Sequence, residues 1–199
     1  MNADTDFTDS VQLNLQQQMT SGNENAFRKL YHHYYKRLLQ FAFILTKNNE
    51  VAEELVENVF IKFWKNKQNA EAIRNLKVYL YTATKNTCLN YLSSKAHASI
   101  TEPFAAINIE LAGPICPDQL LIFRETFAKI NDAIETLPPK CKMIFKLIRE
   151  DGLKYKEVAE ILNLSPHTVD AQMTIAIRRI ASLVKEEFEK IPGGSILKK

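Results

Sequence analysis

The sequence has few of the features that β-rich or membrane-spanning proteins need. Only five of its 199 residues are glycine, and no convincing run of alternating polar and apolar residues predicts a strand. The longest apolar run, FAFIL, is far shorter than the ~20 residues that span a bilayer. The N-terminus lacks the basic region and apolar core of a signal peptide. We therefore expect an all-α, cytoplasmic protein with no direct membrane insertion.

Its cysteines and histidines form none of the patterns that bind metals or catalyse reactions. Cys88, Cys116 and Cys141 lie far apart without a CxxC pair, which argues against a disulfide framework and a zinc site and favours a packing role. The four histidines are scattered, and neither a glycine-rich phosphate loop nor a carboxylate–histidine constellation occurs. We expect no catalytic residue, no metal and no cofactor, and therefore not an enzyme.

Residues 96–117 divide the chain into two parts. They hold two acidic residues and no lysine or arginine, whereas both flanks are weakly basic and the net charge is +3. This charge pattern permits DNA contact without demonstrating it. The stretch is also rich in proline and has no sustained helical period, which is unusual inside one compact domain. We predict two small helical domains, 1–95 and 118–199, joined by a flexible linker; one domain with a long loop is the alternative.

Apolar periodicity and chain-breaking residues locate the expected helices. Before the linker they span residues 9–20, 24–46, 50–66 and 75–94; after it they span 119–136, 139–150, 155–162 and 166–189.

The last two helices have the spacing of a helix-turn-helix. Val158 and Leu162 are expected to face the core, and Ala159 stands where two helices would cross closely. Asn163 can adopt the left-handed backbone of the turn, and Ser165 can cap a helix that starts at Pro166. An apolar stripe follows on that helix, at Val169, Met173, Ala176, Ile180 and Leu183.

The opposite face of this last helix carries short polar groups followed by cations. Its members are His167, Thr168, Asp170, Ala171, Thr174, Arg178 and Arg179. Short side chains suit base edges and thymine methyls in the major groove, whereas the arginines suit phosphates. A solvated surface helix and a purely structural hairpin are the alternatives, and the tight capped turn favours the DNA-reading interpretation.

Three N-terminal stretches accompany this motif: SGNENAFRKLYHHYYKRLLQFAFILT, EVAEELVENVFIKFWKN and NLKVYLYTATKNTCLNYL. Followed by LPPKCKMIFKLIREDGLKYKEVAEILNLSPHTVDAQM, they resemble the bacterial extracytoplasmic-function (ECF) sigma factors, particularly the iron-citrate-type branch found alongside TonB-dependent transport systems. The resemblance covers residues 10–95 and 118–187. It implies an alternative sigma factor that directs core RNA polymerase to specific promoters and starts transcription, with a membrane-bound anti-sigma factor as a further partner.

The resemblance also assigns each domain a role. Residues 1–95 correspond to sigma region two, which binds the polymerase clamp and the melted minus-ten strand. Residues 118–199 correspond to sigma region four, whose helix-turn-helix binds the minus-thirty-five duplex. A response regulator or quorum-sensing regulator also runs through an SxxTV turn, but it would carry a strand-rich N-terminal domain. An all-helical adaptor is the remaining alternative.

The stretch EVAEELVENVFIKFW predicts an acidic ridge beside a buried face. Apolar residues at helical spacing form that buried face: Ala52, Leu55, Val56, Val59, Phe60 and Phe63. The outward side holds Glu53, Glu54, Glu57, Asn58 and Lys62, and the first four form the ridge. It fits a basic protein surface better than DNA, and the resemblance implies the coiled coil of the polymerase clamp. A solvated charge run is the alternative, and Glu57 and Asn58 stand where the family has a Gln–Glu pair.

The stretch NLKVYLYTATKNTCLNYL predicts a surface for an unpaired strand. Tyr79, Thr82, Asn86 and Asn90 fall on one stripe, and Lys77 and Lys85 are expected beside it. Rings stack on exposed bases, amides bond base edges and lysines attract phosphates. The two tyrosines, Tyr79 and Tyr81, could equally be core residues, and we expect burial for Tyr81. The preceding loop, NKQNAEAIRN, lies where members of the family capture a flipped base.

Overall fold

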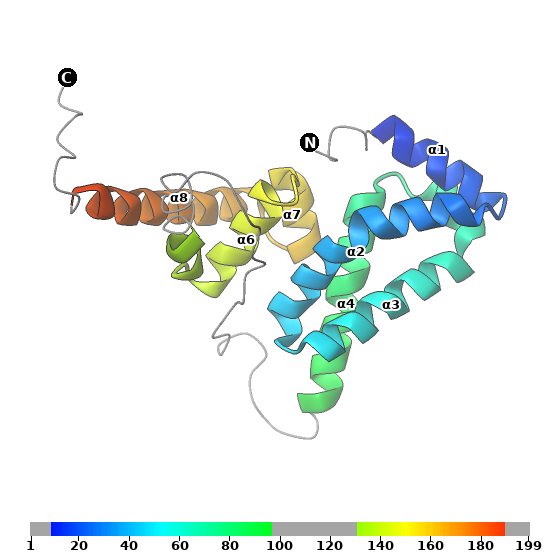
Figure 1. Ribbon diagram of the computed structural model, residues 1–199, viewed down its shortest axis with the longest axis horizontal. Coiled ribbons are helices and arrows are strands. Elements are labelled where there is room, and N and C mark those ends of the chain that lie inside the picture. Colours follow the sequence, from blue (N-terminus) through cyan, green and yellow to red (C-terminus); the bar gives the residue numbers. More distant parts are fainter. Residues whose placement is uncertain (1–8, 97–130, 190–199) are drawn as a thin grey trace, which may run out of the picture. The chain divides into compact units, whose positions relative to one another are not determined.

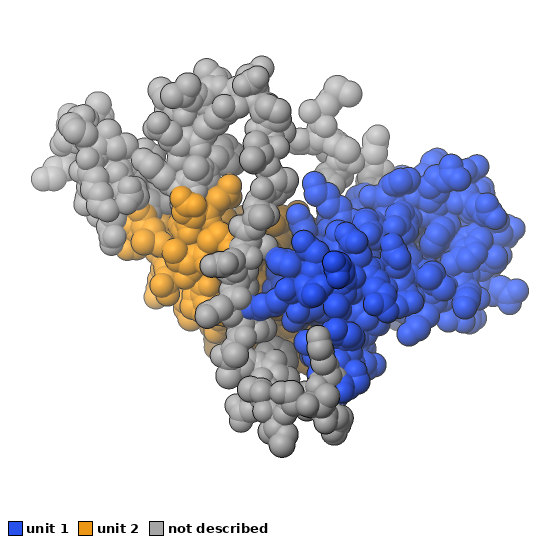
Figure 2. Space-filling model, turned by 60° about the horizontal axis from the view of Figure 1, so that its bottom comes forward, with its two compact units in different colours: residues 1–105 blue, residues 106–199 orange. Residues whose placement is uncertain are grey.

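The computed structural model describes the backbone of residues 9–96 and 131–189 and the side chains of residues 10–94 and 131–183. Every regular element in these ranges is a helix, as predicted (Figure 1). The chain divides into two compact units, residues 1–105 and 106–199 (Figure 2). Most of the predicted linker, 96–117, lies outside the described residues, so its limits and its flexibility stay predictions. No described helix is both long and apolar enough to cross a membrane.

Unit 1 contains α1 (Asp9–Thr20), α2 (Glu24–Thr46), α3 (Asn49–Lys65), the 3-10 helix η1 (Lys67–Ala72) and α4 (Leu76–Ala96). Asparagine side chains cap three of these helices, because a short carbonyl group can accept from the otherwise unpaired amides of a first turn. Asn23 accepts from the N–H of Ala26, Asn48 from that of Val51 and Asn75 from that of Val78. The predicted ends of α1, α2, α3 and α4 differ from the observed ends by two residues at most. Segment 66–75, which was predicted to be a loop, contains η1.

The core of unit 1 lies between α2, α3 and α4. Its largest fully buried side chains include Tyr34, Phe41, Phe60, Phe63 and Tyr81. All six apolar residues that the sequence places on the inner face of α3 are buried, which confirms the 3.6-residue period there. Cys88 is also fully buried, and burial raises the pKa of its thiol to about 12. The packing role predicted for this cysteine is confirmed.

Unit 2 contains α6 (Pro139–Arg149), α7 (Tyr155–Leu162) and α8 (Pro166–Glu189). Residues 131–135, the end of the predicted helix 119–136, are also helical, and the rest of that helix lies outside the described residues. Ile134, Leu137, Cys141 and Ala176 form one buried cluster. The packing role predicted for Cys141 is therefore confirmed as well, and Cys116 falls outside the described residues.

Candidate nucleic-acid and polymerase interfaces

The turn between α7 and α8 has the predicted geometry. Asn163 adopts the left-handed conformation with φ 54°, and the N–H of Leu164 donates to the carbonyl of Ala159 at 2.9 Å. The Ser165 hydroxyl accepts from the N–H of Thr168 at 3.0 Å, so Ser165 caps α8. One expectation is wrong: Leu162 is only half-buried, and Ile161 is the fully buried residue at the end of α7. Ile161 follows Val158 by three residues and shares its buried side, whereas Leu162 lies at the edge of that side.

The predicted DNA-reading face of α8 points away from the core. Val169, Met173 and Ala176 are buried beneath it, and Ile180 and Leu183 are half-buried. The exposed members of the face are His167, Asp170, Ala171, Arg178 and Arg179, whereas Thr168 and Thr174 are half-buried. The Thr168 hydroxyl lies 2.8 Å from that of Ser165 and takes part in the cap. This contact limits the ability of the Thr168 hydroxyl to bond a base edge.

Two exposed isoleucines flank this face and were missed by sequence reasoning. Ile175 and Ile177 project from α8 on either side of the line through Ala171, Thr174 and Arg178. The available sequence signal was their position outside the apolar stripe of α8. Their exposed side chains add apolar area beside the polar and cationic groups.

The acidic ridge of α3 is exposed as predicted at Glu53, Glu54 and Glu57, and Asn58 is half-buried. Ile61 lies one turn beyond Glu57 on the same side and is 49% exposed. The sequence signal for Ile61 was an apolar residue outside the buried stripe. The ridge therefore combines negative charge with an exposed aliphatic side chain.

Two tyrosines of α2 lie beside this ridge and were also missed. The rings of Tyr31 and Tyr35 are stacked, with centroids 4.8 Å apart. Burial raises the pKa of Tyr31 to about 12, with Tyr35 and the Glu57 carboxylate contributing. Burial also raises the pKa of Tyr35, followed by the charges of Glu53 and Glu57. The phenol groups of Tyr31 and Tyr35 are therefore close enough to the Glu53 and Glu57 carboxylates to feel their charge. Helices α2 and α3 thus contribute to one surface.

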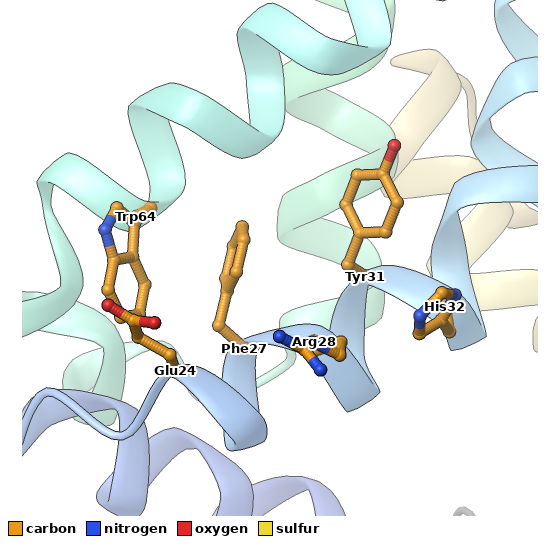
Figure 3. Close-up of a pocket in the computed structure, with 6 residues that line it drawn as sticks. All are labelled: Glu24, Phe27, Arg28, Tyr31, His32 and Trp64. Carbon is orange, nitrogen blue, oxygen red and sulfur yellow. The ribbon is translucent and has the colours of Figure 1, made fainter.

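A hollow of about 460 Å³ lies beside Tyr31 (Figure 3). Its lining residues come from α2 and the end of α3: Glu24, Phe27, Arg28, Tyr31, His32 and Trp64. The rings of Phe27 and Trp64 are 4.9 Å apart, and the Lys67 ammonium lies 4.0 Å from the Trp64 ring. The hollow is therefore lined by the aromatic rings of Phe27, Tyr31 and Trp64 and by the polar side chains of Glu24, Arg28 and His32.

The stripe predicted on α4 is partly accessible. Tyr79 is 37% exposed and its ring lies 5.9 Å from that of Phe63, whereas Tyr81 is buried as expected. Asn86 and Asn90 are exposed. Thr82 is half-buried, and its hydroxyl oxygen is enclosed without a hydrogen-bond partner among the described residues. The accessible part of the stripe is thus one ring followed by two amides.

The expected position of Lys85 beside the stripe needs correction. Its side chain is only 6% exposed, because Lys85 follows the buried Tyr81 by one helical turn and shares its inward side. Burial lowers the pKa of its ammonium group. Lys77 is half-buried and is the more accessible of the two lysines.

The segment predicted to be a base-capturing loop contains regular secondary structure. The 3-10 helix η1 occupies Lys67–Ala72, with Ala70 buried. The exposed polar side chains of segment 66–75 are Asn66, Gln68, Asn69, Glu71, Arg74 and Asn75. Gln68, Asn69 and Glu71 project from η1 itself, and Arg74 and Asn75 lie between η1 and α4.

Both units match known protein families. Residues 30–98 match the family Sigma-70 region 2, and residues 127–180 match Sigma-70, region 4. The chain is 23% identical over 163 residues to the ECF RNA polymerase sigma factor SigW of Bacillus subtilis (strain 168), covering 78% of this chain and 87% of that protein. It is 25% identical over 185 residues to the ECF RNA polymerase sigma-E factor of Escherichia coli (strain K12), covering 89% and 95%.

Solved structures share the fold. The sigma factor RpoE of Bartonella quintana, solved with the anti-sigma factor NepR, superposes with a TM-score of 0.58 at 21% identity and covers 80% of this chain and 96% of its own. CnrH, solved with the cytosolic domain of CnrY, gives a TM-score of 0.56 at 18% identity and covers 89% and 99%. With region 2 and region 4 matched in that order on the two helical units, the chain belongs to the ECF-type sigma-70 family.

Proposed function

We propose that this sigma factor holds core RNA polymerase through the acidic ridge of α3 and reads promoter DNA through α4 and α8. The observation that carries the proposal is that α3 packs into the core with one side and exposes acidic residues on the other. Six of its apolar residues are buried, whereas Glu53, Glu54 and Glu57 are exposed and form no salt bridge among the described residues. These charges are therefore available to a partner without any loss of folding contacts.

The chemistry of the ridge favours a basic protein surface as this partner. Carboxylates repel DNA phosphates but attract lysine and arginine, and complementary charge increases the association rate. Ile61 adds an exposed apolar side chain beside Glu57, and the fully buried core of a protein interface is more apolar than its rim. We propose that this combined surface binds the coiled coil of the polymerase clamp.

The α4 stripe is proposed to hold the melted minus-ten strand. Tyr79 offers a ring for stacking, and Asn86 and Asn90 offer amides to base edges. Lys77 supplies attraction to phosphates, whereas the burial of Lys85 favours a supporting role beneath the stripe. Segment 66–75 is proposed to capture the flipped base with its exposed polar side chains.

On α8, the proposal assigns the N-terminal turns to the minus-thirty-five major groove. Asp170, Ala171 and Thr174 are proposed to meet base edges and methyl groups, with His167 and Thr168 near the entrance to the groove. Arg178 and Arg179 lie further along the helix, where phosphates are the nearer partners.

An anti-sigma factor is proposed as the regulator of this activity. RpoE and CnrH, which share the fold, were each solved with a second protein, the anti-sigma factor NepR and the cytosolic domain of CnrY. The iron-citrate-type resemblance supports a membrane-bound anti-sigma factor for this chain, with the sigma factor itself acting in the cytoplasm.

Charge reversal on the ridge tests the proposed polymerase contact. Glu53→Lys combined with Glu54→Lys should weaken binding of core polymerase by about tenfold or more, because two attractions become repulsions. Asp132→Lys combined with Glu150→Lys is the matched control, since it changes the net charge equally at exposed positions of unit 2. Equal binding by both double variants in a core-polymerase titration would contradict the assignment.

A further inference from the structure

Segment 66–75 is bound along one edge by side chains of α1. The Thr20 hydroxyl shares its one hydrogen between the carbonyl of Gln16 at 3.0 Å and that of Lys67 at 3.3 Å. The side-chain amide of Gln16 donates to the carbonyls of Ala70 at 2.8 Å and Ile73 at 3.0 Å. These carbonyls are three residues apart, and a 3-10 helix has three residues per turn, so they lie along the same edge of the segment.

Gln16 is well placed to fix this segment. Its side chain is 3% exposed, and its amide nitrogen contacts two successive carbonyls 54 and 57 residues away in the sequence. Because a primary amide has two hydrogens in a fixed plane, the two bonds together restrain both the position and the rotation of the segment. The carbonyl of Ala70 also accepts from the N–H of Ile73 at 3.1 Å, so Gln16 adds to a turn that is already closed.

The helix that carries Gln16 is itself attached to the core. The hydroxyl of the fully buried Tyr34 in α2 donates to the side-chain oxygen of Gln12 in α1 at 2.8 Å. A series of hydrogen bonds therefore runs from α2 through α1 to η1. The order of the segment depends on a helix that none of the proposed contacts with DNA or polymerase involves.

The edge of η1 opposite these bonds is the accessible one. Ala70 is buried and Lys67 and Ile73 are half-buried, whereas Gln68, Asn69, Glu71 and Arg74 are exposed. Anchoring the carbonyl edge thus determines the direction in which these polar side chains point. A flipped base pays less entropy on binding to a segment that is ordered in advance.

We propose that Gln16 is a positioning residue for base capture, acting through the carbonyls of Ala70 and Ile73. The inference rests on the proposed function, in which segment 66–75 receives the flipped base. Gln16 touches no nucleotide in this scheme. Its effect is to hold the exposed side chains of the segment in the geometry that recognises the base.

The test uses the full chain assembled with core polymerase, on a pre-melted promoter obtained by selection with this holoenzyme. Binding is compared between the promoter and the same DNA with an abasic site at the first melted position. The unsubstituted protein should favour the intact base by about tenfold. Gln16→Met keeps the side-chain length but removes both donors, and it should reduce this ratio by about fivefold or more while core-polymerase affinity changes little.

Thr84→Val is the matched control, since it removes a buried hydrogen bond within α4 of the same unit that involves neither α1 nor the segment. Hydrogen exchange should accelerate at the amides of residues 67–75 in Gln16→Met and not in Thr84→Val. Gln16→Asn keeps the amide but is too short to reach both carbonyls, so it should repeat the effect of Gln16→Met if the latter folds poorly.

An unchanged ratio of intact to abasic binding in Gln16→Met, or an equal loss in Thr84→Val, would overturn the positioning role. Unaltered exchange in residues 67–75 would overturn it too. If the unsubstituted holoenzyme melts promoters without preferring the intact base, the proposed role of segment 66–75 fails, and the inference fails with it. Absence of promoter melting altogether would instead contradict the proposed function.

Discussion

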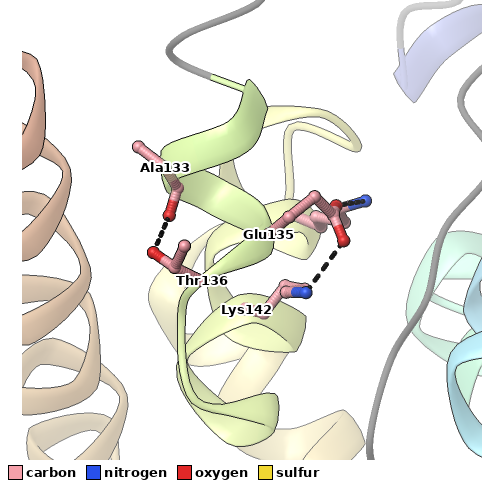
Figure 4. A network of polar contacts seen from close by, with 5 residues as sticks. Ala133, Glu135, Thr136 and Lys142 are labelled. Atoms are coloured by element: carbon pink, nitrogen blue, oxygen red, sulfur yellow. Dashed lines mark hydrogen bonds and ion pairs between the residues drawn. The ribbon is translucent and has the colours of Figure 1, made fainter.

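The ammonium group of Lys142 lies 2.9 Å from the carboxylate of Glu135, although the Lys142 side chain is only 1% exposed (Figure 4). The other Glu135 oxygen lies 3.5 Å from the ammonium of Lys146. One carboxylate at the N-terminal side of the helix-turn-helix unit therefore balances two cations of α6. Unit 2 carries the proposed minus-thirty-five contacts, so an ion pair that stabilises this unit also supports promoter binding.

Removing each partner of this ion pair should have unequal effects. Glu135→Ala leaves a buried ammonium without its carboxylate and should cost about 3 kcal/mol, the lower end for buried pairs because Glu135 is one-third exposed. Lys142→Met removes the buried charge and keeps the packing volume, so it should be nearly neutral. Hydrogen exchange of the α6 amides measures both effects. A larger loss in Lys142→Met than in Glu135→Ala would contradict this account.

The two ends of α8 should affect promoter binding differently. Asp170→Ala should change which minus-thirty-five bases are preferred, because a good base contact discriminates by about 1–3 kcal/mol. Arg178→Ala should weaken all promoters alike and lower the salt dependence by about one phosphate. Selection from a library randomised in the minus-thirty-five element measures both. Altered base preference in Arg178→Ala alone would mean that α8 is rotated in the groove.

Tyr79 should act after polymerase binding. Its ring is accessible and supported by Phe63, so Tyr79→Ala should remove stacking worth about 1–3 kcal/mol from the open complex. Tyr79→Phe retains the ring and should retain most of the activity. Permanganate footprinting on duplex and pre-melted promoters tests this. If Tyr79→Ala reduced the permanganate signal on both templates only in proportion to a loss of polymerase affinity, Tyr79 would have a structural role in unit 1 and no role in stacking.

The stability of unit 1 should fall at alkaline pH partly through Tyr31. The folded state raises the pKa of this phenol from 10.0 to about 12, so the unfolded state loses its proton first. The stabilising contribution is present below pH 10 and is lost as the pH rises towards 12. Tyr31→Phe should therefore lose less stability across this interval than the unsubstituted chain. Urea unfolding monitored by the fluorescence of Trp64 provides the measurement.

Tyr155→Phe serves as the control for this pH dependence, because it removes an exposed phenol in the other unit. Its unfolding profile at Trp64 should match that of the unsubstituted chain. An equal reduction of the alkaline loss by both substitutions would remove the link to Tyr31.

The local elements were predictable from the sequence because their signals lie within a few neighbouring residues. The bounds of α1, α2, α7 and α8 coincide with the predicted ones, and the inner face of α3 was identified from its period. Asn163 and Ser165 carry the turn before α8 through their own backbone conformation and hydrogen bonding. Such features depend on residues i to i+4, so a linear pattern contains them.

The surfaces formed by residues distant in the chain required the tertiary structure. Whether Lys85 is buried depends on the helices packed around α4, and the pattern of α4 alone placed it too close to the accessible stripe. The contact of Gln16 with Ala70 spans 54 residues and has no local signature. The same holds for Tyr35, which shares a surface with Glu53 only because α2 and α3 are packed together. Periodicity determines which side of a helix is apolar, whereas packing decides which polar groups that side encloses and which neighbours the other side acquires.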